Sequence, residues 1–377
     1  MNKTIISVIA ATALSTAVYA TNGDELIGIG AKSRGMAGAG IALTHGAESA
    51  LINPALITSV KSTEVSFGGT IMMPDVETDG TQSDADLSMA PAVSIASKVN
   101  ENLYIGVGMW ATAGMGVDYR GTGFNGDMSS NMQMMQFGVP VAYKTGALSV
   151  GVTPVLQYGS LDVTYAGSTT EGAAQDLALG CNAGVAYTMG SVSIGAIYKA
   201  PIEMTYTGQI SRLMADQAGI VNTYSDKLER PEEYGVGIAY QAGEHAVALD
   251  YKRINWSSAK GYSDFGWDDQ DVIALGYQYT QNNWALRAGY NYAKSPIGDQ
   301  SAKTDGLIIN RLNLTAFPAI VESHYTVGGS YAFNNTMSVD AAYVYAPEET
   351  MTLQGDAGAV TTKHSQSNVS VQLTINF

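Results

Sequence analysis

From residue 61 onward, the chain consists of short segments in which apolar and polar residues alternate. The last segment shows the pattern most clearly: Val369, Val371 and Leu373 occupy every second position, with Ser370 and Gln372 between them. Successive side chains of a strand point to opposite faces of its sheet, so each segment predicts a strand with one apolar and one polar face. About fourteen such segments follow one another, which is typical of a soluble β-sandwich or a membrane-spanning β-barrel.

The aromatic residues favour the barrel. They concentrate near the ends of the predicted strands, where a barrel has its interfacial girdles, as at Trp284, Tyr290, Tyr292, Tyr343 and Tyr345. The mean hydropathy of +0.02 is high for a chain without an apolar run of the roughly 20 residues that a membrane helix needs. Because backbone polar groups in hydrocarbon must be hydrogen-bonded internally, we predict an all-β fold, a transmembrane antiparallel β-barrel of about fourteen strands over residues 61–377.

The N-terminus and the charge indicate the compartment. Residues 1–20 combine Lys3, an apolar run from Ile5 to Val18 and Ala20 before the expected cleavage point, the pattern of a signal peptide. We therefore expect a monomer in the outer membrane of a Gram-negative cell, surrounded by outer-membrane lipid and lipopolysaccharide. The net charge of −15 and the lack of basic clusters argue against nucleic-acid binding. The histidines have no metal-binding spacing, and we expect no cofactor.

The connections between the predicted strands alternate strictly between tight turns and long loops. The tight turns lie near residues 100, 145, 190, 243, 282 and 335, and the long connections span 74–86, 112–130, 167–178, 208–231, 257–268, 294–322 and 346–366. Outer-membrane barrels have short periplasmic turns and long outer loops, so this alternation orients the chain and places both termini in the periplasm.

Residues 21–60 differ from the rest of the chain, because they are rich in glycine and alanine and lack strand alternation. A barrel of about fourteen strands is too wide for its own side chains to fill. We predict that this segment forms a packed plug, or hatch, inside the barrel. The alternative is a disordered tail, but its apolar content and few charges argue against disorder.

The same segment resembles the N-terminus of the outer-membrane family that includes long-chain fatty-acid and toluene-type hydrocarbon transporters. The resemblance rests on residues 30–40 (GAKSRGMAGAG) and on the INPALIT sequence, and it continues through 233–240 (EYGVGIAY) and 286–292 (LRAGYNY). It implies a fourteen-stranded barrel for hydrophobic substrates with a hatch gated at Asn53, Pro54 and Ala55. It also implies that Phe377 is the C-terminal aromatic residue recognised by the outer-membrane insertion machinery.

The family resemblance further implies an inward kink of the third strand that opens the barrel wall sideways. On our count this strand covers residues 103–119, and its alternation breaks in the upper part. Glycine within a strand permits a bend or bulge, so we place the lateral opening at Thr112, Ala113 and Gly114. The alternative is an ordinary strand end that leads into a loop.

Candidate substrate contacts come from inward-facing positions. Met132 and Met134 of the fourth strand would suit a greasy pocket, because thioethers adapt to varied shapes, although they would equally fill gaps against the hatch. Lys199, Lys252 and Arg287 also face inward and would neutralise a carboxylate. The alternative for these three is structural pairing, for example with Asp250 and Asp340.

Two apolar stretches in the long loops are candidates for substrate capture, namely Leu213 with Met214, and Leu312, Leu314 and Phe317. Alternatively, they fold down and cap the lumen. No catalytic constellation supports an enzyme, and a structural or adhesive barrel has no need of a gated lumen. We therefore predict uptake of hydrophobic compounds, with long-chain fatty acids as first choice and aromatic or alkane hydrocarbons as the alternative.

Overall fold

The computed structural model describes residues 21–165, 172–221 and 223–377. The predicted signal peptide, residues 1–20, lies outside the described residues, as does part of the predicted loop at 167–178. Among the described helices, none combines the length and the apolar character that crossing a membrane requires.

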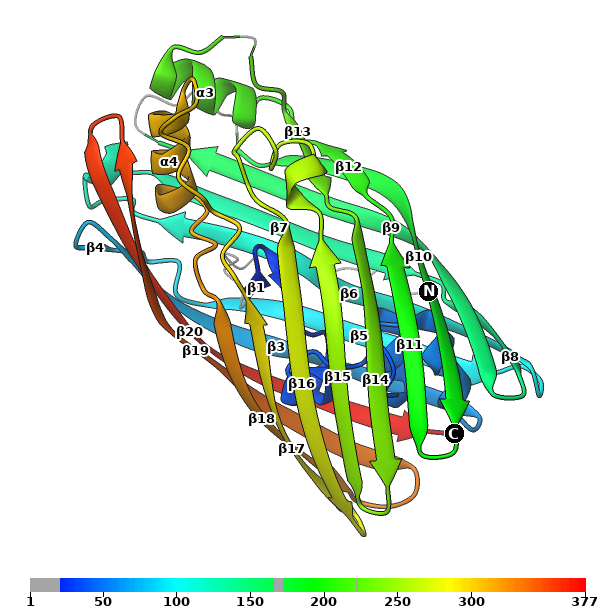
Figure 1. The fold of residues 1–377 in the computed structure, drawn as a ribbon. Helices are drawn as coiled ribbons and strands as arrows, with labels where there is room; N and C mark the ends of the chain where they lie inside the picture. Colours follow the sequence, from blue (N-terminus) through cyan, green and yellow to red (C-terminus); the bar gives the residue numbers. More distant parts are fainter. Residues whose placement is uncertain (1–20, 166–171, 222) are drawn as a thin grey trace, which may run out of the picture.

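Fourteen antiparallel strands form a closed barrel, as predicted (Figure 1). The last strand pairs with the first, with Val371 opposite Gly69, so the sheet has no free outer edge. In chain order the strands are β3 (Thr63–Thr78), β5 (Ser88–Lys98), β6 (Leu103–Asp118), β7 (Ser129–Gly138) continued by β8 (Val141–Thr145), β9 (Leu148–Thr164), β10 (Ala174–Met189), β11 (Val192–Lys199), β14 (Glu233–Ala242), β15 (His245–Ile254), β16 (Gln270–Gln281), β17 (Trp284–Ala293), β18 (Ser323–Ala332), β19 (Met337–Gly355) and β20 (Gly358–Asn376).

The two faces of the wall have the polarity of a membrane barrel rather than of a β-sandwich. Apolar side chains such as Val371 and Leu249 are about half exposed on the outside, whereas Gln372 and Asn368 are buried inside. A soluble sandwich would bury the apolar face. The outward band of apolar residues therefore faces lipid, and Phe377, which is 74% exposed, lies on that outer face at the end of the last strand.

The prediction of a long loop at 346–366 is wrong. β19 and β20 continue as a paired ribbon beyond the membrane-facing wall, through a bulge between Ala346 and Glu349, to a tight turn where Gly355 pairs with Gly358. Figure 1 shows this ribbon (red) projecting from the outer end of the barrel. The strand pattern was obscured because a ribbon outside the lipid has no need of an apolar face.

The predicted hatch occupies the barrel interior (dark blue in Figure 1). Its elements are β1 (Thr21–Asn22), β2 (Glu25–Leu26), helix α2 (Ala31–Gly35) and two 3₁₀-helices, η1 (Gly46–Leu51) and η2 (Pro54–Ser59). Glycines of the wall allow it to approach closely: a Cβ added at Gly184 would lie 2.0 Å from Oδ1 of Asn53. The hatch therefore packs directly against the backbone of β10.

The outer loops carry their own structure. They contain β4 (Thr81–Gln82), the short 3₁₀-turns η3 (Phe124–Gly126) and η4 (Trp256–Ser258), the paired strands β12 (Ile202–Thr205) and β13 (Lys227–Arg230), and helices α3 (Ile210–Ala218) and α4 (Gly306–Thr315). Figure 1 shows α3 and α4 together at the outer end of the barrel, where they roof the lumen.

Candidate functional site

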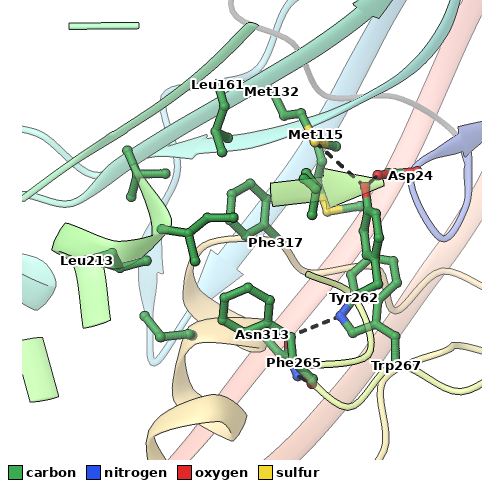
Figure 2. A pocket seen from close by; sticks show the side chains of 14 residues that line it. Asp24, Met115, Met132, Leu161, Leu213, Tyr262, Phe265, Trp267, Asn313 and Phe317 are labelled. Atoms are coloured by element: carbon green, nitrogen blue, oxygen red, sulfur yellow. Dashed lines mark hydrogen bonds between the residues drawn. The ribbon is translucent and has the colours of Figure 1, made fainter. Parts of the chain in front are cut away.

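An apolar cavity lies beneath the outer loops (Figure 2). Strands β6, β7 and β9 supply one side, helices α3 and α4 the roof, and the loop after β15 the aromatic side. The lining residues are Asp24, Met115, Met132, Leu161, Val163, Ile210, Leu213, Leu228, Tyr262, Phe265, Trp267, Leu312, Asn313 and Phe317. Carbon and sulfur make up nearly all of this surface, as in sites for hydrophobic ligands.

Two aromatic rings of the loop after β15, Tyr262 and Trp267, line the cavity, and Trp256 of the same loop packs against both. Trp256, Tyr262 and Trp267 contact one another with ring centroids 4.6 to 5.2 Å apart. The indole Nε1 of Trp267 donates a hydrogen bond to Oδ1 of Asn313 on α4 at 3.1 Å. This bond joins the loop to the roof helix and fixes the ring faces that line the cavity.

The predicted capture residues do not face water. Leu213, Leu312 and Phe317 line the cavity, and Met214 and Leu314 are fully buried beside them. Of the two alternatives for these loop residues, the geometry matches the one in which they fold down and cap the lumen.

The two predicted pocket methionines have different surroundings. Met132 lines the cavity, and its Sδ lies 3.8 Å from the hydroxyl of Tyr262. Met134 is buried but does not line the cavity, and its Sδ accepts a hydrogen bond from Nε2 of Gln157 at 3.8 Å. Met115 of β6 lines the cavity although the sequence did not single it out.

The predicted basic residues lie away from the cavity, in ion pairs. Nζ of Lys199 and Nζ of Lys252 lie 3.0 and 3.7 Å from Oε1 of Glu233, and Nη1 of Arg287 lies 3.6 Å from Oδ1 of Asp340. None of the three cations lines the cavity. The pairing alternative therefore matches the geometry.

Asp250 was expected to join such pairs, but the structure places it differently. Its carboxylate accepts hydrogen bonds from the backbone N–H groups of Gly40 and Ile41 at 2.7 and 2.8 Å. This side chain therefore fastens the hatch to β15.

Among the described residues that line the cavity, Asp24 is the one with an ionisable carboxyl group, and sequence reasoning missed it. Its carboxylate accepts a hydrogen bond from the hydroxyl of Tyr262 (Figure 2), and its backbone carbonyl accepts one from the N–H of Gly114 at 3.1 Å. Burial, with a further contribution from the neighbouring Glu25, raises the pKa of Asp24 to about 8. The carboxyl group is therefore mostly protonated at pH 7, and the cavity carries little charge.

The third strand has a β-bulge in the segment that was predicted to kink. A register shift between Ala111 and Ala113 leaves Thr112 as the extra residue of a β-bulge against β7. Burial alternates up to Trp110 and is then continuous from Trp110 to Val117, because both faces of this part of β6 are covered.

A gap in the wall ladder accompanies this bulge. Pairing between β5 and β6 ends at Ala92 opposite Trp110, and beyond it Glu25 of the hatch pairs with Ala113 in place of β5. The wall closes again at the outer end, where the N–H of Asp84 donates to the carbonyl of Asp118 at 2.7 Å. Between these two points, β5 and β6 share no ladder.

The Asn53–Pro54–Ala55 segment joins the hatch to the wall. Oδ1 of Asn53 caps η2 by accepting from the N–H of Ala55 at 3.1 Å. Its Nδ2 donates to the carbonyls of Ile41 at 2.7 Å and Val185 of β10 at 3.2 Å. One buried side chain thus ties together two parts of the hatch and the barrel.

A protein-family comparison identifies the fold and the class of function. The model of the outer membrane protein transport protein family (OMPP1/FadL/TodX) matches residues 7–376. The chain belongs to this family. Its members are outer-membrane β-barrels that transport hydrophobic compounds, and they are not enzymes.

Known relatives agree with the assignment. The chain is 23% identical to the long-chain fatty acid transport protein of Salmonella typhi over 364 residues, covering 78% of this chain and 80% of the relative. Among solved structures, the Pseudomonas putida toluene transporter TodX superposes with a TM-score of 0.71 at 19% identity, covering 95% of this chain and 100% of TodX. A Pseudomonas aeruginosa FadL homologue gives a TM-score of 0.73 at 15% identity, covering 94% and 100%.

Proposed function

We propose that this barrel takes up neutral hydrophobic compounds about the size of one aromatic ring. The observation that carries the proposal is the composition of the cavity: carbon and sulfur line it almost entirely, and none of the described residues that line it is a lysine or an arginine. Four aromatic side chains, Tyr262, Phe265, Trp267 and Phe317, give it ring faces on which a planar molecule would stack.

The lack of a lining cation favours a neutral cargo over a fatty acid. Burying a carboxylate without a cation costs several kcal/mol, and the ionised carboxylate of Asp24 in the cavity lining would add to that cost by repulsion. Lys199, Lys252 and Arg287 are already paired with carboxylates of the wall. We therefore favour the hydrocarbon alternative over our first expectation of long-chain fatty acids.

Long-chain fatty acids remain the second candidate, since one relative of this chain is named for their transport. Several structural neighbours, including TodX and the CymD monoaromatic hydrocarbon channel, are named for aromatic cargo. The two candidates differ in the need for a cation, which makes them separable by binding measurements.

For release, we propose that the cargo leaves sideways through the gap between β5 and β6 into the lipid. Met115, in the part of β6 that has no ladder with β5, lines the cavity, and so does Asp24, whose carbonyl accepts a hydrogen bond from Gly114 in the same part of β6. Asn53 holds the hatch closed against the wall, which disfavours passage straight into the periplasm. In this proposal the capping residues Leu213 and Leu312 admit the cargo from outside.

A pair of matched variants on one strand tests the function. Val163→Trp fills the cavity from β9, whereas Val152→Trp places the same side chain on the lipid-facing side of that strand, where Val152 is 48% exposed. We expect the purified wild-type barrel to bind toluene and the Val163→Trp barrel to bind it at least tenfold more weakly, with the Val152→Trp barrel unchanged. Tight binding of oleate with no binding of toluene would contradict the neutral cargo and support the fatty-acid candidate.

A further inference from the structure

Arg34 is a buried cation that nothing in the transport route uses. Its side chain lies on helix α2 of the hatch and is 1% exposed. Nη1 donates to the carbonyl of Gly28 at 2.9 Å, but Nε and Nη2 have no partner among the described residues. Desolvation lowers the pKa of Arg34 to about 10, which still leaves the guanidinium charged at pH 7. A charge buried in this way is strongly unfavourable unless an opposite charge neutralises it.

The wall beside Arg34 carries a second set of polar atoms without partners. Oγ1 of Thr326 on β18 donates a hydrogen bond to the carbonyl of Gly35 at 3.1 Å. This bond holds the end of α2 against β18, and His324 lies two residues before Thr326 on the same strand. Both ring nitrogens of His324 lack partners within the described chain, as do both amide atoms of Gln366 and of Asn368 on β20. All three side chains are at most 2% exposed.

The strand register brings these groups to one place. β19 separates β18 from β20, and there Ala346 pairs with Gln366 and Val344 with Asn368. Alanine and valine are short, so they leave room on the inner face of the wall for the longer polar side chains of β18 and β20 on either side. Helix α2 also contacts β20, because the N–H of its Ala31 donates to Oε1 of Gln372 at 3.1 Å.

We propose that Arg34, His324, Gln366 and Asn368 form an internal binding site for a small monovalent inorganic anion such as chloride. The guanidinium supplies the charge, and the amide and imidazole N–H groups supply further donors. Water alone would satisfy the hydrogen bonds but would leave the charge of Arg34 without compensation.

The surroundings limit the anion to a small one. An apolar cluster lies next to Asn368 and includes Ile27, Met72 and Val344, each at most 2% exposed. A hydrocarbon chain attached to the anion would have to pass through this packed cluster. The anion would therefore be a resident part of the structure that joins hatch helix α2 to strands β18 and β20. This role is independent of which cargo the barrel carries.

Bromide tests the site directly in the unmodified protein. Crystals soaked in sodium bromide should show an anomalous peak within hydrogen-bonding distance of Nε or Nη2 of Arg34. Thermal unfolding of the barrel in detergent should occur about 2–4 °C higher in sodium chloride than in sodium gluconate of equal ionic strength, because a ligand that binds only the folded state stabilises it.

Two variants on the same helix complete the test. Arg34→Gln should abolish the difference between chloride and gluconate, whereas Lys32→Gln, which removes a nearby cation paired at 3.9 Å with Glu64, should preserve it. Ordered water without bromide density, or a carboxylate of a bound amphiphile at the site, would overturn the proposal, as would equal stability in both salts. The bromide result stands even if Arg34→Gln fails to fold, and no part of the test depends on cargo uptake.

Discussion

Deleting Thr112 should close the barrel wall with minimal disturbance to the rest of the strand. Thr112 is the extra residue of the bulge, flanked by the pairs Ala111 with Met135 and Ala113 with Met134. Its removal leaves the register with β7 correct on both sides and restores the alternation of faces. The straightened β6 would then extend its ladder with β5 beyond Trp110 and displace Glu25 from its pairing with Ala113.

The expected loss of uptake follows from the area that the cargo keeps out of water. An aromatic ring of the size of a phenylalanine side chain buries about 150–250 Å². At about 25 cal/mol per Å², release into water instead of lipid costs about 4–6 kcal/mol. Since 1.4 kcal/mol corresponds to a factor of ten, release should slow by about three to four orders of magnitude.

Uptake of radiolabelled toluene, compared at equal amounts of surface protein, measures this effect. The deletion variant should fall to the level of cells that lack the protein, while toluene binding by the purified barrel persists because Leu161 and Val163 are untouched. Thr112→Ala keeps the chain length and the bulge, and it should transport normally. Wild-type uptake by a folded and abundant deletion variant would refute lateral release at this strand and favour passage through the hatch.

Three further predictions concern the hatch, assembly and pH. Asn53→Ala removes the hydrogen bonds to Ile41 and Val185 and the cap of η2. Amide hydrogen exchange in residues 53–60 should therefore accelerate at least tenfold and uptake should fall, while the heat-modifiable barrel persists. Unchanged exchange would show that these bonds do not hold the hatch. Deleting Phe377 should reduce the yield of folded barrel without affecting secretion, as measured by heat-modified migration on gels, and a normal yield would leave this residue as lipid-facing surface. The pKa of Asp24 is raised to about 8, and a bound cargo desolvates the carboxyl group further, so binding favours its protonated form. Toluene affinity should therefore decline as the pH rises from 7 to 9. The Asp24→Asn variant should bind toluene equally at both pH values, and a pH dependence that persists in this variant would have to come from another group.

Much of the architecture was predictable because the membrane imposes a local pattern on each strand. The outward faces must be apolar and the backbone must close on itself, so alternation along segments such as 369–377 predicted the barrel. The hatch stood out through its small residues. The β-bulge of β6 at Thr112 lies in the segment where glycine and a break in alternation, which are also local signals, had predicted a kink.

Residue alternation did not predict the structure correctly outside the lipid-facing wall. Outside the lipid neither face of a strand needs to be apolar, and the ribbon at 346–366 was therefore mistaken for a loop. Inside the barrel, alternation indicated that Lys199, Lys252 and Arg287 point inward, but their partners come from other strands. The register between strands decides which carboxylate pairs with which cation. It places Glu233 between Lys199 and Lys252, and no local pattern in the sequence predicts this ion-pair network.

The cavity arises from contacts between residues that are far apart in the chain. Asp24 of the hatch, Met132 of β7, Leu213 of α3, Trp267 of an outer loop and Phe317 near α4 meet only after the barrel has closed and the outer loops have folded over it. The sequence singled out Met132, Leu213 and Phe317 in their own segments, but no local pattern indicated that they share one cavity with Asp24 and Trp267. Periodicity along a strand reports whether a side chain faces lipid or lumen, because that depends on neighbouring residues alone, whereas the shape and charge of the lumen depend on which distant elements fill it.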